Sequence, residues 1–503
     1  MLITSDQQHW DTIGAFNPQV KTPNLDKLVK KGTLFSRAYC PNPTCTPTRA
    51  SIITGMYPSQ HGAYSLGTKL MENVPTIGST LQNNNIDCSL IGKAHFQQLI
   101  STDEYPSEES YPKLKDLEYW KQYDQDFYGF NHVELARNHA DETHVGQHYA
   151  IWMEDNGLKD WQKHFQNTWQ NYQFGDKVNH PQEHSWSLPD EFHYNKWIAD
   201  RSIARISDCK EAGKNFFLWS SFFDPHPPYL IPEPWASMYD PNDIKVPEIT
   251  YGEHDKNPPH FSMTQEEKPD FSSYQEEGGN GMHGMQCHLH DREKMAKNIA
   301  IYYGMISAMD KYIGDILDKV EAEGMTEETL IVFTSDHGHF FGQHGLMAKG
   351  PFHYEDVIKV PFIVSCPGTV NEEKVSDALQ SLVDLAPTFL DFLEIQKPTS
   401  MTGISQKQVW SGNADSARDH VIIENRHQPT TIHLKTYIDQ RYKLTTYYNQ
   451  NYGELFDLEK DPGEINNLWE DENSKDLKAQ LIQKLLFAEM GNEPMPMPRV
   501  SPA

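Results

Sequence analysis

The stretch Leu330-Ile331-Val332-Phe333-Thr334-Ser335-Asp336-His337-Gly338 is a continuous apolar run that ends in an acid, a histidine and a glycine. A short apolar run closed by turn residues is typical of a buried β-strand. It follows residues 292–323, where apolar side chains recur at helical spacing and predict a long amphipathic helix. A long helix followed by a buried strand is the repeating unit of a parallel sheet.

The same alternation recurs along the first 400 residues. Short apolar runs predict four more strands, and a segment with an early proline and a terminal glycine predicts another helix. The strands are residues 2–4, 86–91, 216–220 and 360–364, and the helix is 22–32. This order predicts an α/β fold with a mostly parallel central sheet and helices on both faces.

The pattern changes after about Ser400. Short β-like runs at 421–423 and 442–444 precede a last helix near 475–487. We therefore expect a catalytic α/β domain over residues 1–400 and a smaller C-terminal α+β subdomain over 401–503. Residues near 100–200 and 250–290 lack clean periodicity and are interpreted as insertions in the first domain.

Polar residues follow several of the predicted strands. Asp6, Lys93, His226 and Asp336 each come just after an apolar run, and ligands of open α/β sheets bind outside the carboxyl ends of the strands. Two of these positions pair a carboxylate with a neutral ligand, as Asp6-Gln7 and Asp336-His337. Oxygen-rich ligands suit calcium or magnesium, and the added imidazole also allows manganese or zinc. An ordinary turn after a strand is the plainer interpretation of Asp336-His337-Gly338.

The segment Cys45-Thr46-Pro47-Thr48-Arg49 carries the most specific pattern in the chain, a cysteine followed by a proline two residues later and an arginine four residues later. If Cys45 begins a helix, Arg49 lies one turn further along. A buried structural cysteine in a proline-containing turn is the alternative. Lys93 and His95, His226 and Lys349 are further candidate cations, and together with a metal ion they would neutralise a sulfate-like group. Taken singly, such lysines are usually ordinary surface residues.

Taken in order, these motifs resemble the formylglycine sulfatases of the alkaline-phosphatase superfamily. The resemblance covers nearly the whole chain and includes the C-x-P-x-R motif at Cys45, residues 92–95, residues 336–338 and the tail at 453–464. It implies a sulfuric ester hydrolase whose nucleophile is a hydrated formylglycine made from Cys45 by a formylglycine-generating enzyme. One hydroxyl of the hydrate would attack sulfur, and the other would later expel sulfate by re-forming the carbonyl.

The resemblance also assigns roles. Asp6, Gln7, Asp336 and His337, with the modified Cys45, would bind one divalent metal, for which Ca²⁺ is favoured over Mg²⁺ and Mn²⁺. Arg49 and Lys93 would hold the nucleophile. His95 would help collapse the hemiacetal, and His226 and Lys349 would contact the sulfate, one of them assisting departure of the leaving group.

Two of the expected metal ligands depart from the commoner sulfatase pattern, and Thr48 stands where Ser is commoner. Gln7 stands where many sulfatases have Asp, and His337 stands where many have Asn. This Gln/His version is similar to that of phosphonate monoester hydrolases, so a phosphonate monoester or phosphodiester hydrolase with the same nucleophile is the alternative activity. A sugar-binding protein with unmodified Cys45 is a second alternative, and soft-metal binding by residues 282–288 is a third.

The amino-acid composition limits the kinds of molecule that this chain is expected to bind. With 43 basic and 71 acidic residues the net charge is −28, which excludes nucleic acid as an expected partner. No stretch of about 18 apolar residues predicts a membrane span, and six dispersed cysteines do not form a disulfide framework. The start of the chain lacks a secretory signal. This favours the cytoplasm, or the periplasm or secretion if a leader was trimmed. Trp- and Tyr-rich insertions favour a sulfated sugar as substrate, whereas the oligomeric state is not indicated.

Overall fold

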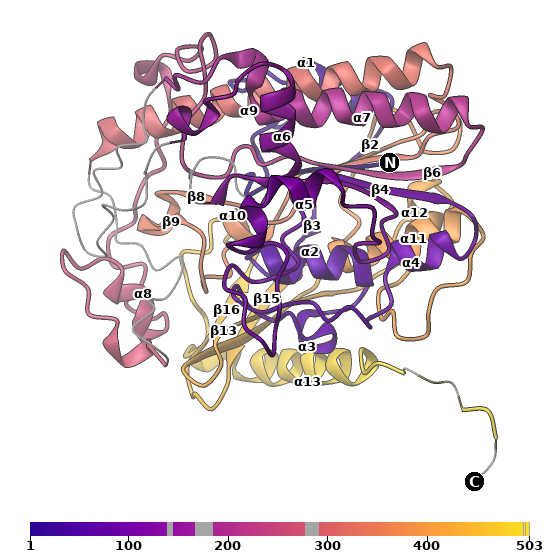
Figure 1. Ribbon diagram of the computed structural model, residues 1–503. Coiled ribbons are helices and arrows are strands. Elements are labelled where there is room, and N and C mark those ends of the chain that lie inside the picture. Colours follow the sequence, from indigo (N-terminus) through magenta and orange to yellow (C-terminus); the bar gives the residue numbers. More distant parts are fainter. Residues whose placement is uncertain (138–143, 166–184, 277–290, 496, 498, 502–503) are drawn as a thin grey trace.

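An eight-stranded sheet forms the centre of the protein (Figure 1). A computed structural model describes residues 1–137, 144–165, 185–276, 291–495, 497 and 499–501. The strand order is β11-β2-β10-β7-β1-β6-β4-β5. The strands are β1 (Leu2–Ser5), β2 (Gly32–Phe35), β4 (Asp87–Gly92), β5 (His132–Leu135), β6 (Phe216–Ser221), β7 (Ile331–Ser335), β10 (Phe362–Ser365) and β11 (Lys374–Ser376). Only β10 pairs antiparallel with its neighbours in this sheet, so the predicted mostly parallel sheet is confirmed.

Helices cover both faces of this sheet (Figure 1). Successive strand residues point to opposite faces, and accordingly Leu2 and Ile3 belong to two different apolar clusters. The Ile3 cluster is built with α1 (Pro23–Lys30), α7 (Tyr194–Glu211) and α9 (Arg292–Ala322). The Leu2 cluster is built with α2 (Cys45–Thr54), α4 (Ile77–Gln82) and α11 (Leu385–Phe392). The predicted helices on both faces are therefore present.

The C-terminal part forms a second, smaller sheet. Strands β13 (Val421–Gln428), β14 (Ile432–Ile438), β15 (Tyr442–Tyr447) and β16 (Gly453–Asp457) pair antiparallel in chain order. Helix α13 (Lys475–Gly491) packs on this sheet through Leu481, Leu485 and Ala488. This is the predicted small α+β unit, while its boundary at residue 400 stays a prediction.

Shorter elements complete the described chain. They are α3 (Pro58–His61), α5 (Leu117–Lys121), α6 (Gln147–Asp155), α8 (Pro259–Met263), α10 (Glu355–Ile358), α12 (Lys407–Trp410), β3 (Ala38–Tyr39), β8 (Phe340–Phe341), β9 (Met347–Ala348) and β12 (Gln380–Ser381). The region expected as an insertion near 100–200 contributes β5, the edge strand of the central sheet. Within the described ranges, no helix is both long enough and apolar enough to cross a membrane.

The small sheet fixes the loop that precedes α2. The backbone amide of Glu424, on β13, donates to the carbonyl of Pro41 at 2.8 Å. The side-chain amide of Asn42 donates to the carbonyl of Glu424 at 2.7 Å. Asn42 in turn accepts from the Thr44 hydroxyl at 2.6 Å. The entry to α2 therefore depends on a strand almost 400 residues later in the chain.

Gly92 ends β4 at the point where the chain turns toward Lys93. Its φ is +108°, and a Cβ at this position would lie 2.0 Å from the carbonyl oxygen of Ser221 on the paired strand β6. A side chain here would thus meet both backbone strain and a collision with rigid backbone.

We predict that Gly92→Ala lowers the free energy of unfolding by about 2–4 kcal/mol, because strain and steric overlap add. Gly213→Ala is the matched control, since Gly213 has φ +61° and a Cβ added there would meet no heavy atom within 4 Å. The control should lose only about 1 kcal/mol. Urea denaturation of both variants measures the difference, and equal losses would contradict the predicted collision.

Candidate active site

Helix α2 begins at Cys45, so Arg49 lies one turn further along the same helix. Every residue of the helix is buried, and Cys45 is only 1% exposed. The first turn of a helix has unpaired backbone amides and a positive dipole end. The Cys45 side chain is therefore held in an environment that favours negative charge.

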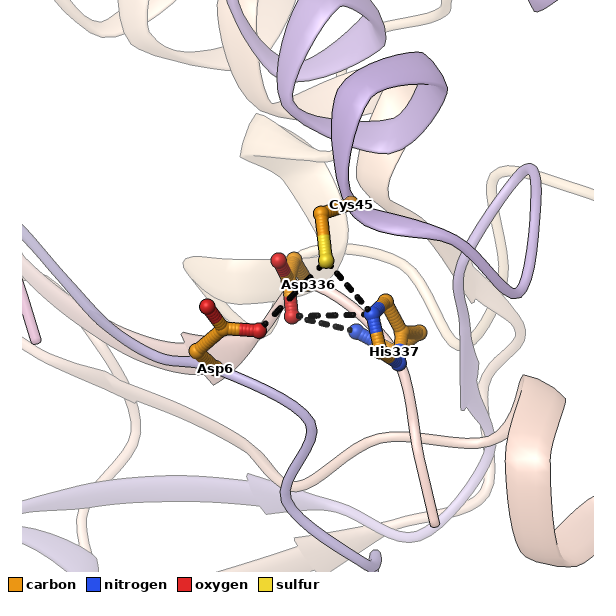
Figure 2. Close-up of side chains that lie close together, drawn as sticks. All are labelled: Asp6, Cys45, Asp336 and His337. Carbon is orange, nitrogen blue, oxygen red and sulfur yellow. Dashed lines mark hydrogen bonds and ion pairs between the residues drawn. The ribbon is translucent and has the colours of Figure 1, made fainter. Parts of the chain in front are cut away.

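Four side chains converge at the N-terminal end of α2 (Figure 2). Asp6, Cys45, Asp336 and His337 each offer a ligand atom, and these atoms all lie within 4.8 Å of one another. The Cys45 Sγ is 3.2 Å from His337 Nε2 and 3.7 Å from Asp6 Oδ1. His337 Nδ1 lies 3.0 Å from the Gly338 carbonyl and donates to it, so that Nε2 is the ring nitrogen that faces the cluster.

Gln7 supplies a fifth donor atom, an amide oxygen. Its Oε1 is buried and has no hydrogen-bond partner among the described residues. Its Nε2 donates to His339 Nδ1 at 2.7 Å, and His339 Nε2 contacts the Tyr229 hydroxyl at 2.7 Å. Buried polar atoms are rarely left without a partner. An orphaned amide oxygen beside two carboxylates and an imidazole is the donor set of a divalent metal, so the residues fit such an ion.

The side chain of Arg49 connects the ends of several strands of the central sheet next to this cluster. Its guanidinium is fully buried. Nε donates to Asp336 Oδ2 at 2.8 Å, and Nη1 donates to the Lys93 carbonyl at 2.9 Å and to Ser221 Oγ at 2.8 Å. Nη2 lies 3.7 Å from Asp6 Oδ2. These contacts position the carboxylates directly, whereas the predicted role of Arg49 in holding the nucleophile stays a prediction.

Two lysines reach the Cys45 sulfur. Lys349 Nζ lies 3.0 Å from Sγ, and Lys93 Nζ lies 3.8 Å from it and forms an ion pair with Asp6. Lys349 Nζ is also 3.4 Å from His226 Nε2. Because His226 Nδ1 donates to the Pro227 carbonyl at 2.6 Å, its Nε2 is the acceptor in that contact.

These contacts set the protonation states of the site. Burial alone would raise the pKa of the Cys45 thiol, but Lys349, Lys93 and His337 hold it well below its ordinary value. Burial and Cys45 would raise the pKa of Asp6, yet Lys93 and other nearby cations hold it below its usual range. The site therefore stabilises negative charge at the position of Sγ.

The His95 loop is held by a carboxylate that the sequence did not single out. Glu109 is buried and accepts from the backbone amides of His95 and Phe96 at 2.8 Å and of Gln97 at 2.9 Å. His95 has a φ of +57°, an unfavourable conformation for a side-chain-bearing residue. Burial and the neighbouring Arg137 keep the pKa of the His95 ring well below its ordinary value, so the ring is neutral.

The structure brings all the predicted site residues to one edge of the sheet. They are Asp6, Gln7, Cys45, Arg49, Lys93, His95, His226, Asp336, His337 and Lys349. Sequence reasoning missed His339, Glu109 and Arg137. His339 follows the recognised Asp336-His337-Gly338 and could have been found by its spacing, while Glu109 lies in a loop without a pattern. The soft-metal loop expected at 282–288 lies outside the described residues.

This fold and this donor set define a hydrolase of the alkaline-phosphatase superfamily. The Sulfatase family profile matches residues 1–395, and the profile described as N-sulphoglucosamine sulphohydrolase, C-terminal, matches residues 342–490. The chain belongs to the sulfatase family.

Individual relatives agree with this assignment. An arylsulfatase of Clostridium perfringens is 27% identical over 504 residues, covering 97% of this chain and 94% of the relative. A phosphonate monoester hydrolase of Silicibacter pomeroyi has a similar fold, with a TM-score of 0.76, 23% identity and coverage of 99% and 96% of the two chains. A structure solved with its substrate D-glucosamine-2-N,6-O-disulfate has a TM-score of 0.70, 19% identity and coverage of 98% of both chains.

Asp336→Ala should release the metal and also lower the stability of the protein, because the side chain is both a metal donor and the acceptor of the buried Arg49 Nε hydrogen bond. Asp310→Ala is the control: Asp310 is equally buried but accepts from the backbone amides of Asn24 and Leu25 at the start of α1. Elemental analysis of the folded, gel-filtered proteins measures metal content. Stoichiometric metal in Asp336→Ala, or loss in both variants alike, would contradict the assignment.

Proposed function

We propose that this chain hydrolyses sulfate monoesters, with sulfated carbohydrates as the substrate class. The nucleophile is a formylglycine hydrate made from Cys45, and one divalent metal, Ca²⁺, completes the site. The observation that carries the proposal is the position of Cys45 Sγ, which lies between a cluster of metal donors and the ammonium groups of Lys93 and Lys349.

The donors favour a hard cation. Asp6, Gln7 and Asp336 offer oxygen, and only His337 offers nitrogen, a set that suits Ca²⁺ better than a soft metal. When bound, such an ion stabilises charge on the sulfate group and lowers the pKa of the nucleophile. The formylglycine hydrate supplies two hydroxyls on one carbon, at the place that Sγ marks.

The two lysines neutralise the sulfate. Lys349 Nζ lies 3.0 Å from Sγ, so an oxygen of a sulfate group bound next to the nucleophile would accept a hydrogen bond from it. The His226 Nε2 lone pair faces the same ammonium group at 3.4 Å. Lys349 and His226 therefore share a proton beside the position of the leaving oxygen, which suits general acid assistance.

His95 is suited to accept a proton rather than to donate one. Because its ring is neutral and buried near Cys45, it can accept the proton of the second hydroxyl when the carbonyl re-forms. Glu109 fixes the backbone of His95 and so holds the ring in place.

A phosphonate monoester or phosphodiester hydrolase is the second candidate function. It is favoured by Gln7 and His337 among the metal donors, the combination that the sequence shares with phosphonate monoester hydrolases. The similar fold of the Silicibacter pomeroyi enzyme is compatible with it. Sugar sulfate as the substrate class is supported by the structural neighbour whose substrate is a disulfated glucosamine.

We expect protein coexpressed with a formylglycine-generating enzyme to carry an aldehyde at Cys45 and to hydrolyse 4-nitrophenyl sulfate faster than 4-nitrophenyl phenylphosphonate. Peptide mass spectrometry and parallel initial rates measure this. Cys45→Ala should abolish turnover of both esters and keep the fold, whereas Cys40→Ala, at a buried cysteine directly after β3, should keep activity. An intact thiol in fully active enzyme would refute the nucleophile, and a faster phosphonate reaction would favour the second candidate.

Lys349→Ala should lower kcat and kcat/KM together by about 100- to 1000-fold, because it removes a buried donor that tightens as charge develops. Lys311→Ala is the control, since Lys311 lies on α9 and pairs with Asp315 at the surface. Steady-state kinetics on 4-nitrophenyl sulfate measures both. A Lys349→Ala enzyme within about threefold of the parent enzyme would show that this lysine does not act on the transition state.

A further inference from the structure

Arg137 lies at the same edge of the sheet as the catalytic candidates. Strand β5 runs parallel to β4, with Leu135 opposite Gly92, and the Ala136 amide donates to the Gly92 carbonyl at 3.1 Å. Arg137 is therefore the second residue after the end of β5, whereas Lys93 is the first residue after the end of β4. It adds a further cation at a strand end, on the outermost strand of the sheet.

The Arg137 side chain is buried without the partners that such a cation requires. It is 7% exposed. Its Nε is buried and unbonded, and no described residue accepts a hydrogen bond from its guanidinium. Guanidinium groups offer five donors, and burying one unpaired is costly. An anion that the described residues do not supply would satisfy Nε.

Glu109 does not fill this role. Its Oε1 is 4.0 Å from Arg137 Nε, which is beyond a hydrogen bond. Both of its oxygens already accept backbone amides from His95 to Gln97. Glu109 thus lends charge to Arg137 and leaves the guanidinium donors open.

The guanidinium nonetheless belongs to the electrostatic environment of the nucleophile. Burial lowers the pKa of Arg137. The negative charges of Glu109 and Cys45 raise this pKa, whereas the positive charge of Arg49 lowers it further. In the sheet order, however, β5 is three strands from β1, or roughly 14 Å at about 4.8 Å per strand. The end of β5 therefore lies outward from the reacting group beside Asp6 and Cys45, which already has Lys93 and Lys349.

We propose that Arg137 forms a subsite for a second anionic group on the substrate, a carboxylate or a further sulfate. This rests on the proposed function and deepens it, because it makes multiply charged sugar esters the preferred substrates. The planar fork of the guanidinium matches either oxyanion by two parallel hydrogen bonds. Strand β5 positions the backbone of Arg137, and Glu109 interacts with the guanidinium only as an opposite charge 4.0 Å away.

The test is calorimetric binding to full-length, metal-loaded protein in a Cys45→Ala background, where no turnover consumes the ligand. Two matched pairs serve as probes: D-glucosamine-2-N,6-O-disulfate against D-glucosamine 6-O-sulfate, and phenyl sulfate with and without a meta carboxylate. The measured quantity is the ratio of the two Kd values within each pair. Arg137→Gln is compared with Arg201→Gln, which breaks the 2.6 Å pair between Arg201 and Glu134 of the same strand β5.

We expect the starting protein to bind the doubly charged member of at least one pair more tightly. Arg137→Gln should reduce that preference by about 10- to 100-fold, as expected for charge-assisted hydrogen bonds, and Arg137→Lys should restore part of it. Arg201→Gln should leave the ratio unchanged.

Two results would overturn the subsite. One is the absence of any preference for doubly charged ligands in the starting protein. The other is an equal weakening of both members of each pair in Arg137→Gln, which would place Arg137 on the reacting sulfate or in a purely structural role. Since the ratio does not depend on turnover, it tests Arg137 even if the preferred ester proves to be a phosphonate.

Discussion

The buried guanidinium of Arg49 is the contact on which the active site depends. Through Asp336, Asp6, the Lys93 carbonyl and Ser221 it joins the ends of four neighbouring strands, β7, β1, β4 and β6. A charge taken out of water at this depth is tolerated only if it is paired. Here Nε and Nη1 donate hydrogen bonds, and Nη2 has only the 3.7 Å ion pair with Asp6. The groups that pair with Arg49 include two of the metal donors, so the same interaction that stabilises the sheet edge also fixes the geometry of the donor cluster.

Three of the described residues with a strained backbone lie at the same edge. Gln7, His95 and Ala348 have φ values of +62°, +57° and +61°. Each is a site residue or immediately precedes one. A side-chain-bearing residue in this region costs of the order of 1–3 kcal/mol, and it persists only when surrounding contacts determine the conformation. Glu109 provides such contacts for His95 through three backbone amides.

The sequence predicted the sheet, its long helix and the catalytic candidates because those features are local. An apolar run ending in Asp336 or Lys93 identifies both a strand and the residue that follows it. The antiparallel direction of β10 could not be inferred from residues 360–364, because both faces of the strand are buried and its pattern is the same in either direction. The residues that were missed depend on tertiary contacts instead. Arg137 follows a four-residue edge strand, too short to stand out by periodicity, and Glu109 acts through backbone amides of a loop that only the fold brings to it. His339 carried a detectable signal, since it lies three positions after Asp336, but its role depends on Gln7, more than 300 residues earlier.

The hydrogen bond between Asn42 and Glu424 can form only after Glu424 has been synthesised. The two residues are 382 positions apart, so a ribosome adding about 5–20 residues per second makes the second roughly 20 to 80 seconds after the first. Until then the loop ahead of Cys45 lacks its hydrogen bonds to β13. Once β13 has docked, the thiol is 1% exposed and closed off. If Cys45 is converted to formylglycine as proposed, the converting enzyme would have this interval before the loop is anchored to β13, and slower translation of the C-terminal sheet would lengthen it.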